Sequence, residues 1–185
     1  MAAQLGVSRV PVREAMMALE REGLLVFDSR GAARVRDFTP EDFEEIFTLR
    51  LALEPMAARR ACWKLQPSDV TALEENIGRM RDTLCLLEVT LLDVEFHDLV
   101  VQAARHSRLH ASWANLRSQL RVWLARLHRH QGSLTETRGN SVSGHLEVLR
   151  ALQSGDAESS AGLMHEHLVS WRERMPKTMW EGNVL

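Results

Sequence analysis

The stretch QLGVSRVPVREAMMALEREGLL, residues 4–25, decides which fold the first part of the chain adopts. Gly6 allows a left-handed backbone, which ends a helix sharply. Ser8 then stands where it can cap a second helix, and Pro11 falls in the first turn of that helix, where its missing N–H costs little. Apolar residues follow at three- and four-residue spacing, which predicts a helix with one face turned toward a small core. These residues are Val12, Ala15, Met16 and Leu19.

Two arginines, Arg9 and Arg13, stand at the start of this predicted helix and away from its apolar face. When a helix enters the major groove, its N-terminal side chains reach base edges or phosphates, and arginine makes a bidentate contact to guanine. Gly23 ends the helix, and residues 24–27 and 32–35 then predict two short strands around a turn, which together form a wing. An ordinary amphipathic helix with surface arginines accounts for the periodicity equally well.

The segment LGVSRVPVREAMMALEREGLL resembles the winged helix-turn-helix of GntR-type transcription regulators. Its Gly-Val-Ser-Arg turn, its Pro-Val-Arg-Glu-Ala sequence and its Leu-Glu-x-Glu-Gly-Leu ending are hallmarks of that family and follow one another here without a gap. In the family this segment contacts operator DNA through its arginines, and the wing glycine approaches the minor groove. The resemblance therefore implies a DNA-binding site that consists of Ser8, Arg9, Arg13 and Gly31.

The sequence departs from the family at its start. Family members carry one further helix and most of another ahead of the turn, whereas this sequence starts with Met1-Ala2-Ala3-Gln4. We therefore expect the apolar face of the recognition helix to be partly uncovered. Two explanations are open, a start site that was assigned too late and a natural loss of DNA binding.

Composition and charge are those of an ordinary globular protein. Of the 185 residues, 45% are hydrophobic and 26% are charged, which allows one small and one medium domain with a real core. The formal net charge of −2 argues against a general nucleic-acid coat. Residues 1–36 hold six arginines against four acidic residues, so only this part has the sign that a phosphate backbone attracts.

The sequence also predicts the compartment. Cys62 and Cys85 are the only cysteines and are too few for a disulfide framework, which favours a reducing cytoplasm. No apolar run approaches the length that crosses a bilayer, and the N-terminus lacks a basic-then-apolar signal. We therefore expect a cytoplasmic protein without a membrane partner.

A new pattern starts after the wing. Thr39 can cap a helix, Pro40 suits its first position, and Asp42 completes a capping box in the acidic form. From residue 40 onward the pattern predicts helices and short loops and no strand. We expect helices over about residues 40–64, 66–84, 88–104, 108–130, 142–154 and 156–175, with residues 131–141 as the longest loop.

The predicted fold is mainly α. A partial winged helix-turn-helix with a short β-wing occupies residues 1–36, and an antiparallel all-α six-helix bundle occupies residues 37–185. Several acidic residues are expected on polar faces of this bundle. They are Glu44, Glu45, Glu95 and Asp98. His128 and His130 at the end of the fourth bundle helix are expected to be solvated.

Four side chains inside the bundle form a candidate metal site. Asp93 and His97 stand four apart, so they share one helix face and can chelate one ion. His145 and His167 fall in two later helices among apolar neighbours. One carboxylate with three imidazoles suits zinc, nickel, manganese or a similar divalent ion. A histidine on an apolar face can equally be a core residue with satisfied hydrogen bonds, and the Asp-x-x-x-His spacing is common by chance.

Residues 37–175 resemble the all-helical effector domain of the FadR branch of the GntR superfamily, called the FCD domain. Its recurring pieces stand in order, as LRLALEPMAARRA, DVEFHDLVVQAA and GHLEVLRALQSGDAESSAGLMHEHL. Family members that bind metal use an aspartate and three histidines of these pieces, and the resemblance carries those roles to Asp93, His97, His145 and His167. The family's usual Gly-Asn is His106-Ser107 here, which puts in doubt any effector contact of that asparagine.

Two arginines are candidates for binding an effector. Arg50 stands four before Glu54, a spacing that allows an intrahelical ion pair worth a few tenths of a kcal/mol. The resemblance implies instead that Arg50 faces the metal pocket and holds a carboxylate, which its fork of donors suits. Both interpretations are open. Arg121 is a second candidate effector residue, and Trp123 beside it is a candidate for the wall of the same cavity.

The sequence thus predicts a transcription regulator that acts as a homodimer, with two winged helices on adjacent half-sites of an operator. A small organic acid at the metal would change operator affinity through its differential binding to two conformations. One alternative is a metabolite- and metal-binding dimer that no longer binds DNA. A metal-dependent enzyme is a second, less favoured one, because the sequence has no HExxH element and no Ser or Cys nucleophile with a placed partner.

Overall fold

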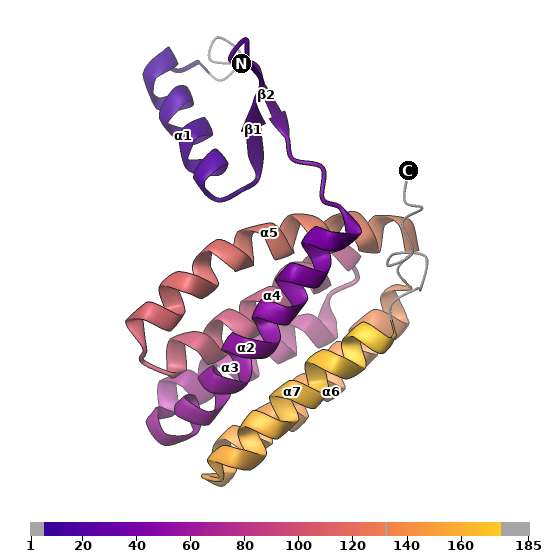
Figure 1. Cartoon of the computed structure of the whole chain (residues 1–185). Helices are drawn as coiled ribbons and strands as arrows, with labels where there is room; N and C mark the ends of the chain where they lie inside the picture. The colour runs from indigo at the N-terminus through magenta and orange to yellow at the C-terminus, as the bar shows by residue number, and fades with distance from the viewer. Residues whose placement is uncertain (1–5, 132, 175–185) are drawn as a thin grey trace. The chain divides into compact units, whose positions relative to one another are not determined.

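The chain forms two compact units, Met1–Phe38 and Thr39–Leu185, which we call the N-terminal and C-terminal units. The computed structural model in Figure 1 describes residues 6–131 and 133–174, and for residues 126–131 it describes the backbone alone. Within these residues there are seven helices and one two-stranded sheet. The prediction of a mainly α fold is confirmed. No helix of the described parts combines the length and the hydrophobicity that a bilayer crossing requires.

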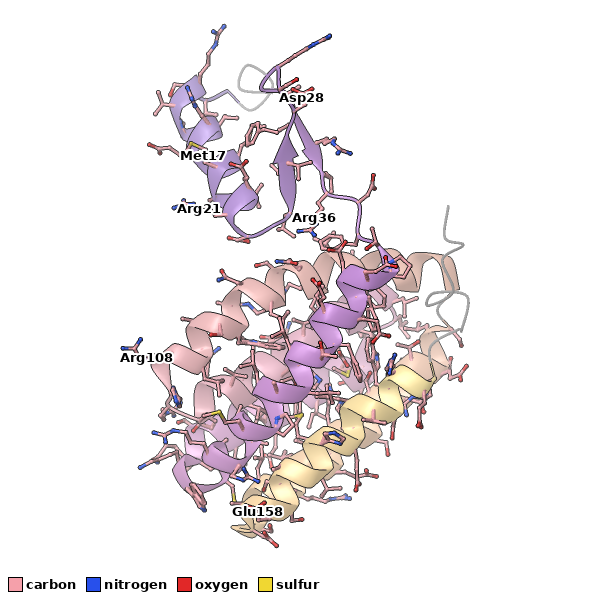
Figure 2. All side chains as sticks on the ribbon, in the orientation of Figure 1. Met17, Arg21, Asp28, Arg36, Arg108 and Glu158 are labelled. Atoms are coloured by element: carbon pink, nitrogen blue, oxygen red, sulfur yellow. The ribbon has the colours of Figure 1, made fainter. Side chains whose placement is uncertain are left out.

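The N-terminal unit contains one helix and a β-hairpin. Helix α1, Arg9–Arg21, is followed by strands β1, Leu25–Phe27, and β2, Ala33–Val35, which pair antiparallel. Gly23 has a positive φ of 73°, so the chain can leave α1 in the left-handed conformation that glycine favours. Asp28 stabilises the hairpin turn (Figure 2), because its Oδ1 accepts hydrogen bonds from the backbone N–H groups of Arg30 and Ala32. The predicted recognition helix and wing are confirmed.

Helix α1 has no fully buried residue among those described. Val12 and Met16 are half-buried, and 39% of Leu19 is exposed, which agrees with the expected partial uncovering of this face. Ala15 is exposed, although the periodicity predicted it on the buried face. Ser8 occupies the predicted N-cap position, although its side chain makes no capping hydrogen bond.

The C-terminal unit is the predicted bundle of six helices. They are α2, Pro40–Lys64; α3, Pro67–Asp82; α4, Leu86–Ala103; α5, Ser107–Gln131; α6, Leu134–Ser154; and α7, Ala157–Glu173. The predicted capping box is present, because Thr39 Oγ1 accepts from the N–H of Asp42 and Asp42 Oδ2 accepts from the N–H of Thr39. Gly155, with φ of 79°, ends α6, and Asp156 caps α7, as expected from their order in the sequence.

The predicted loop over residues 131–141 is wrong. Helix α6 starts at Leu134, and Ser133 caps it by accepting from the N–H of Glu136. Leu134 and Val142 pack against core residues of α3 and α4, and this contact holds a polar segment in a helix that its own composition does not favour. The predicted second helix was too long, because α3 ends at Asp82.

Leu84 and Met56 are two of the large apolar residues of the C-terminal unit that are exposed. Leu84 follows the end of α3 and is 82% exposed, since the chain leaves the helix before this residue can turn inward. Met56 lies within α2 but on the side that faces away from the neighbouring helices. The predicted count of six helices agrees with the described part of this unit.

Helix α4 lies at the centre of the bundle and packs against α2, α3, α5 and α6, while α2 runs beside α7 (Figure 1). A helix that is covered on several sides is apolar around most of its circumference. Helix α4 fits this rule, with Val89, Leu92, Val94, Phe96, Val100 and Val101 all buried. The amide of Asn76 on α3 donates to the carbonyl of Leu92 at 3.1 Å and so satisfies a polar group inside the core.

Asp98 of α4 is buried, although the sequence predicted it on a polar face. It accepts hydrogen bonds from Trp113 Nε1 at 2.9 Å and Gln102 Nε2 at 3.0 Å, and it pairs with Arg117 of α5. These partners compensate the cost of burying a carboxylate. The prediction failed because two of these partners come from a different helix. His128 and His130 lie among the side chains that the structure does not describe.

Candidate functional site

Three histidines from three helices come together inside the C-terminal unit. His97 lies on α4, His145 on α6 and His167 on α7, and one potential ligand nitrogen of each lies within 4.8 Å of those of the others. Their ring centroids are 5.1 to 5.3 Å apart. His97 and His145 are buried, and His167 is half-buried. The structure therefore brings together the three histidines that the sequence predicted as ligands.

Asp93, the fourth predicted ligand, adjoins this cluster. It lies one turn before His97 on α4, and its Oδ1 is 3.4 Å from His145 Nε2. The hydroxyl of Ser141 donates to the same oxygen at 3.0 Å. The tightest group consists of the three histidines alone, and Asp93 stands beside it with one oxygen held by Ser141.

The imidazole of His145 is completely buried and stacks on Phe96, with ring centroids 3.9 Å apart and planes within 6°. Burial lowers the pKa of His145 well below its ordinary value, and the charges of His97 and Arg50 lower it further. Neither ring nitrogen has a hydrogen-bond partner among the described residues. A neutral imidazole with an unpaired nitrogen in the protein interior is a good metal ligand, so this side chain fits a bound divalent ion.

His167 is also held in its neutral form. Burial is the main reason that its pKa lies well below the ordinary value, and the nearby His145 and His97 act in the same direction. Its ring lies directly against the backbone of Gly144 on α6. A Cβ atom at Gly144 would come within 2.8 Å of His167 Cε1 and closer still to Nδ1, so the ring can occupy this position only beside a glycine.

Glu54 of α2 connects His97 to Arg50. Its Oε2 lies 2.5 Å from His97 Nδ1, and its Oε1 accepts a hydrogen bond from Arg50 Nε at 2.5 Å. Burial raises the pKa of Glu54, but the charges and hydrogen bonds of Arg50 and His97 outweigh it and lower that pKa to about 2. Glu54 is therefore an ionised carboxylate inside the protein: Arg50 donates a hydrogen bond to one oxygen, and the other oxygen is in close contact with His97 Nδ1.

Arg50 combines features of both interpretations drawn from the sequence. It forms the predicted ion pair with Glu54, and only 1% of its side chain is exposed. It also lies close enough to the histidines to lower the pKa of His145 and His167, and its guanidinium stands 5.4 Å from the ring centroid of Trp171. Its Nη2 is buried and has no hydrogen-bond partner within the described part of the chain, so it leaves a donor for another group.

The second predicted effector residue, Arg121, is half-buried on α5, and its Nε has no hydrogen-bond partner among the described residues. Its role in the site stays a prediction. Trp123 is buried and packs against Phe43 and Trp171, with ring centroids 4.1 and 6.2 Å away. It belongs to an aromatic cluster that includes the tryptophan beneath Arg50.

Sequence reasoning missed three residues of this site. Glu54 was recognised only as a partner of Arg50, and its contact with His97 depends on the packing of α2 against α4. Ser141 was assigned to a loop, although it lies on α6 and holds Asp93. Gly144 stands in the quoted GHLEV piece, and a glycine inside a predicted helix next to a candidate ligand was the signal that could have identified it.

The predicted DNA-binding residues lie at two places in the N-terminal unit. Ser8, Arg9 and Arg13 are exposed at the start of α1. Gly31 is exposed in the hairpin turn and has a φ of 79°. No described residue covers these four positions, and their contact with DNA stays a prediction.

Two family models match the chain. The FCD domain matches residues 45–170, and the model of bacterial regulatory proteins of the gntR family matches residues 1–35. The HTH-type transcriptional regulator YdhC of Bacillus subtilis is 31% identical over 113 residues, which cover 59% of this chain and 50% of that protein. A Paenarthrobacter nicotinovorans protein named "Probable D-xylose utilization operon transcriptional repressor" is 28% identical over 172 residues, which cover 92% of this chain and 74% of that protein.

The matched segments thus span about half of the first relative and about three quarters of the second. Among solved structures, Escherichia coli McbR/YncC has the same fold, with a TM-score of 0.81 and 22% identity over 94% of this chain and 82% of that chain. The helix and wing of the first unit, the helical bundle of the second and both family models agree. The chain belongs to the GntR family of bacterial regulatory proteins, in the group whose second domain is an FCD domain.

Proposed function

We propose that the protein is a transcription regulator whose affinity for operator DNA is controlled by a small organic acid bound at a divalent metal ion. In this proposal residues 1–36 form the DNA-binding domain and residues 37–185 form the metal- and effector-binding domain. The observation that carries it is the convergence of three histidines from three helices in one buried cluster. The family supports the DNA-binding part, and the relative from Paenarthrobacter is named as an operon repressor.

The chemistry of the donor set supports a metal. His145 and His167 are neutral at physiological pH because burial lowers their pKa values, so each offers a lone pair without first losing a proton. Imidazole suits zinc and nickel, and an added carboxylate from Asp93 also allows manganese. We propose His97, His145, His167 and Asp93 as the ligands. A metal held by these residues would keep coordination positions that a carboxylate oxygen can fill.

The proposed effector contact is Arg50. A buried guanidinium with one unpaired Nη2 donor can hold a carboxylate, since arginine pairs with this group in a planar and directional way. Arg121 of α5 is proposed as a second contact on the basis of its own buried and unpaired Nε. A small molecule with two acidic or polar ends would bind the metal with one end and an arginine with the other.

We also propose that the protein acts as a homodimer on a two-fold symmetric operator. Helix α2 carries three large exposed apolar residues at seven-residue spacing, Leu49, Met56 and Trp63, of which 51%, 46% and 64% are exposed. Seven-residue spacing places them on one helix face, as in helices that pair with a second helix. We call this face the α2 stripe. Effector binding would then change the relative placement of the two DNA-binding units and thereby the operator affinity.

Metal analysis of the wild-type protein and of the double variant His145→Ala/His167→Ala tests this proposal. We expect about one divalent ion per wild-type chain and loss of both the ion and the response to small carboxylates in the variant. Operator binding is measured on the same samples with a labelled DNA fragment from upstream of the gene. A variant that keeps its metal and its response would rule out this site.

One observation favours a second candidate function, a metal- and metabolite-binding dimer that does not bind DNA. The apolar face of α1 is only half covered, and 39% of Leu19 is exposed. An incompletely covered recognition helix positions its arginines less rigidly. The same DNA-binding experiment separates the two, because this alternative predicts metal binding without any operator affinity.

A further inference from the structure

The side chain of Glu54 contacts both a candidate metal ligand, His97, and a candidate effector residue, Arg50. One carboxylate oxygen faces His97 Nδ1 and the other accepts from Arg50 Nε, each at 2.5 Å. All three side chains are 1% exposed. Bulk water therefore has almost no access to either oxygen.

This contact selects one form of the His97 ring. A neutral imidazole carries its proton on either Nδ1 or Nε2, and the nitrogen without a proton is the one that can bind a metal. A carboxylate beside Nδ1 favours the proton on Nδ1, because the carboxylate can only accept a hydrogen bond. The lone pair is then on Nε2, the remaining ring nitrogen. Carboxylate partners of this kind orient metal-binding histidines and increase their basicity.

Arg50 in turn fixes Glu54. Its Nε can only donate, so it holds Oε1 and leaves Oε2 for His97. Helix α2 carries both residues four positions apart, on one helix face. The carboxylate is thereby held in one rotation, and its contact with His97 depends on the pair of residues rather than on Glu54 alone.

We propose that Glu54 is the positioning residue of the metal site: it holds His97 with Nε2 free to bind the ion, and Arg50 keeps Glu54 in the orientation that this requires. The proposal rests on the metal site of the proposed function. To the four proposed ligands it adds a fifth residue, Glu54, whose carboxylate does not itself contact the metal.

The substitution Glu54→Gln gives a sharp test. Arg50 Nε needs an acceptor, so the amide oxygen of Gln would turn to Arg50 and its NH2 group to His97. An NH2 group beside Nδ1 requires Nδ1 to accept, which moves the ring proton to Nε2 and blocks the metal-binding nitrogen. We expect a loss of Zn²⁺ affinity of about 10- to 100-fold, the range that removal of such a partner typically causes.

Asp98→Asn is the matched control. Asp98 is also a buried carboxylate of the bundle, and it pairs with Trp113, Gln102 and Arg117 on the side of α4 that packs against α5. Asp98→Asn lowers stability in the same way as Glu54→Gln, because each substitution removes one of two acceptor oxygens from a buried network. Its effect on Zn²⁺ affinity should stay within about twofold, since its hydrogen-bond partners Trp113, Gln102 and Arg117 are not members of the cluster.

Two measurements decide the proposal. Competition with a chromophoric chelator gives the Zn²⁺ affinity of the wild type and of both variants, with circular dichroism as the check of folding. ¹⁵N NMR of the histidine rings in metal-free wild-type protein gives the tautomer of His97 and needs no substitution, so it decides even if Glu54→Gln does not fold. We expect a protonated Nδ1 in the wild type and a protonated Nε2 in Glu54→Gln.

A protonated Nε2 in the wild type, an unchanged affinity in Glu54→Gln, or an equal loss in Asp98→Asn would each overturn the role of Glu54. These results differ from a failure of the proposed function. If the wild type takes up no Zn²⁺, the proposed metal site is wrong, and the positioning role of Glu54 fails with it. The NMR result would still report whether Glu54 contacts His97 Nδ1.

Discussion

Gly144 of α6 lies against the imidazole of His167 of α7 so closely that no other residue can replace it without moving the ring. An added Cβ would lie 2.8 Å from Cε1, well inside the normal contact distance of two carbon atoms. The space for one histidine of the cluster is therefore provided by a residue that has no side chain.

Gly144→Ala should weaken metal binding although it removes no ligand. The added methyl group displaces the His167 ring from its position beside His97 and His145, and a displacement of this size breaks coordination geometry. We expect a Zn²⁺ affinity lower by about 10-fold or more, in the range for lost support of a ligand. Gly139→Ala is the control, because Gly139 lies on the same helix with open space around its Cβ position. Equal affinities of the two variants would contradict this interpretation.

Metal should stabilise the C-terminal unit against heat. A ligand that binds only the folded state at 100 times its Kd adds about 2.7 kcal/mol, which corresponds to a rise in Tm of about 5–10 °C for a protein of this size. Differential scanning calorimetry of chelator-treated protein, with and without Zn²⁺, measures the shift. His167→Ala should abolish most of it. A shift of equal size in that variant would show that the metal binds elsewhere.

Trp63→Glu should convert the protein from a dimer to a monomer. A charge at this position disrupts the α2 stripe, because an unpaired carboxylate inside an apolar interface is costly. Sedimentation velocity measures the mass of both proteins. Leu84→Glu is the control, since Leu84 is a still more exposed leucine outside α2. A wild-type monomer, or a dimer that persists in Trp63→Glu, would argue against the proposed interface.

Arg13→Ala should weaken operator binding, while Arg21→Ala should change it little. Both arginines are exposed on α1, but Arg13 lies in its first half and Arg21 is its last residue, with Nε donating to the carbonyl of Met17. Loss of a base contact costs about 1–3 kcal/mol, and loss of a phosphate contact lowers the salt dependence instead. Fluorescence anisotropy over a salt series separates the two cases. Equal effects of both substitutions would remove Arg13 from the proposed DNA contact.

The sequence predicted the parts of the fold that depend on local patterns. The capping box at Thr39 and Asp42 and the stop at Gly155 depend on neighbours a few residues apart, and all of these are present. The predicted start of α6 was wrong, because tertiary contacts of Leu134 with α3 and α4 stabilise a helix in a polar segment. Local propensity is too weak to decide such a case.

Prediction of the candidate site was likewise limited to what local patterns and the family resemblance contain. Asp93 and His97 share a helix face, which periodicity can predict, and the apolar neighbours of His145 and His167 pointed to the interior of the bundle. The resemblance to the FCD domain then implied a ligand role for all four residues. The partners of these residues could not be predicted, because Glu54 on α2 contacts His97 on α4, and Ser141 on α6 contacts Asp93 on α4. Such contacts depend on how helices pack against each other, a property that no single segment contains.

The central position of helix α4 affects the whole C-terminal unit. It carries Asp93 and His97 and touches four of the other five helices. A densely packed interior transmits a displacement to its surroundings and does not absorb it. A small shift of α4 at the histidine cluster therefore displaces the helices that pack on several of its sides. Movement of this one helix would alter the packing of most of the others in the bundle.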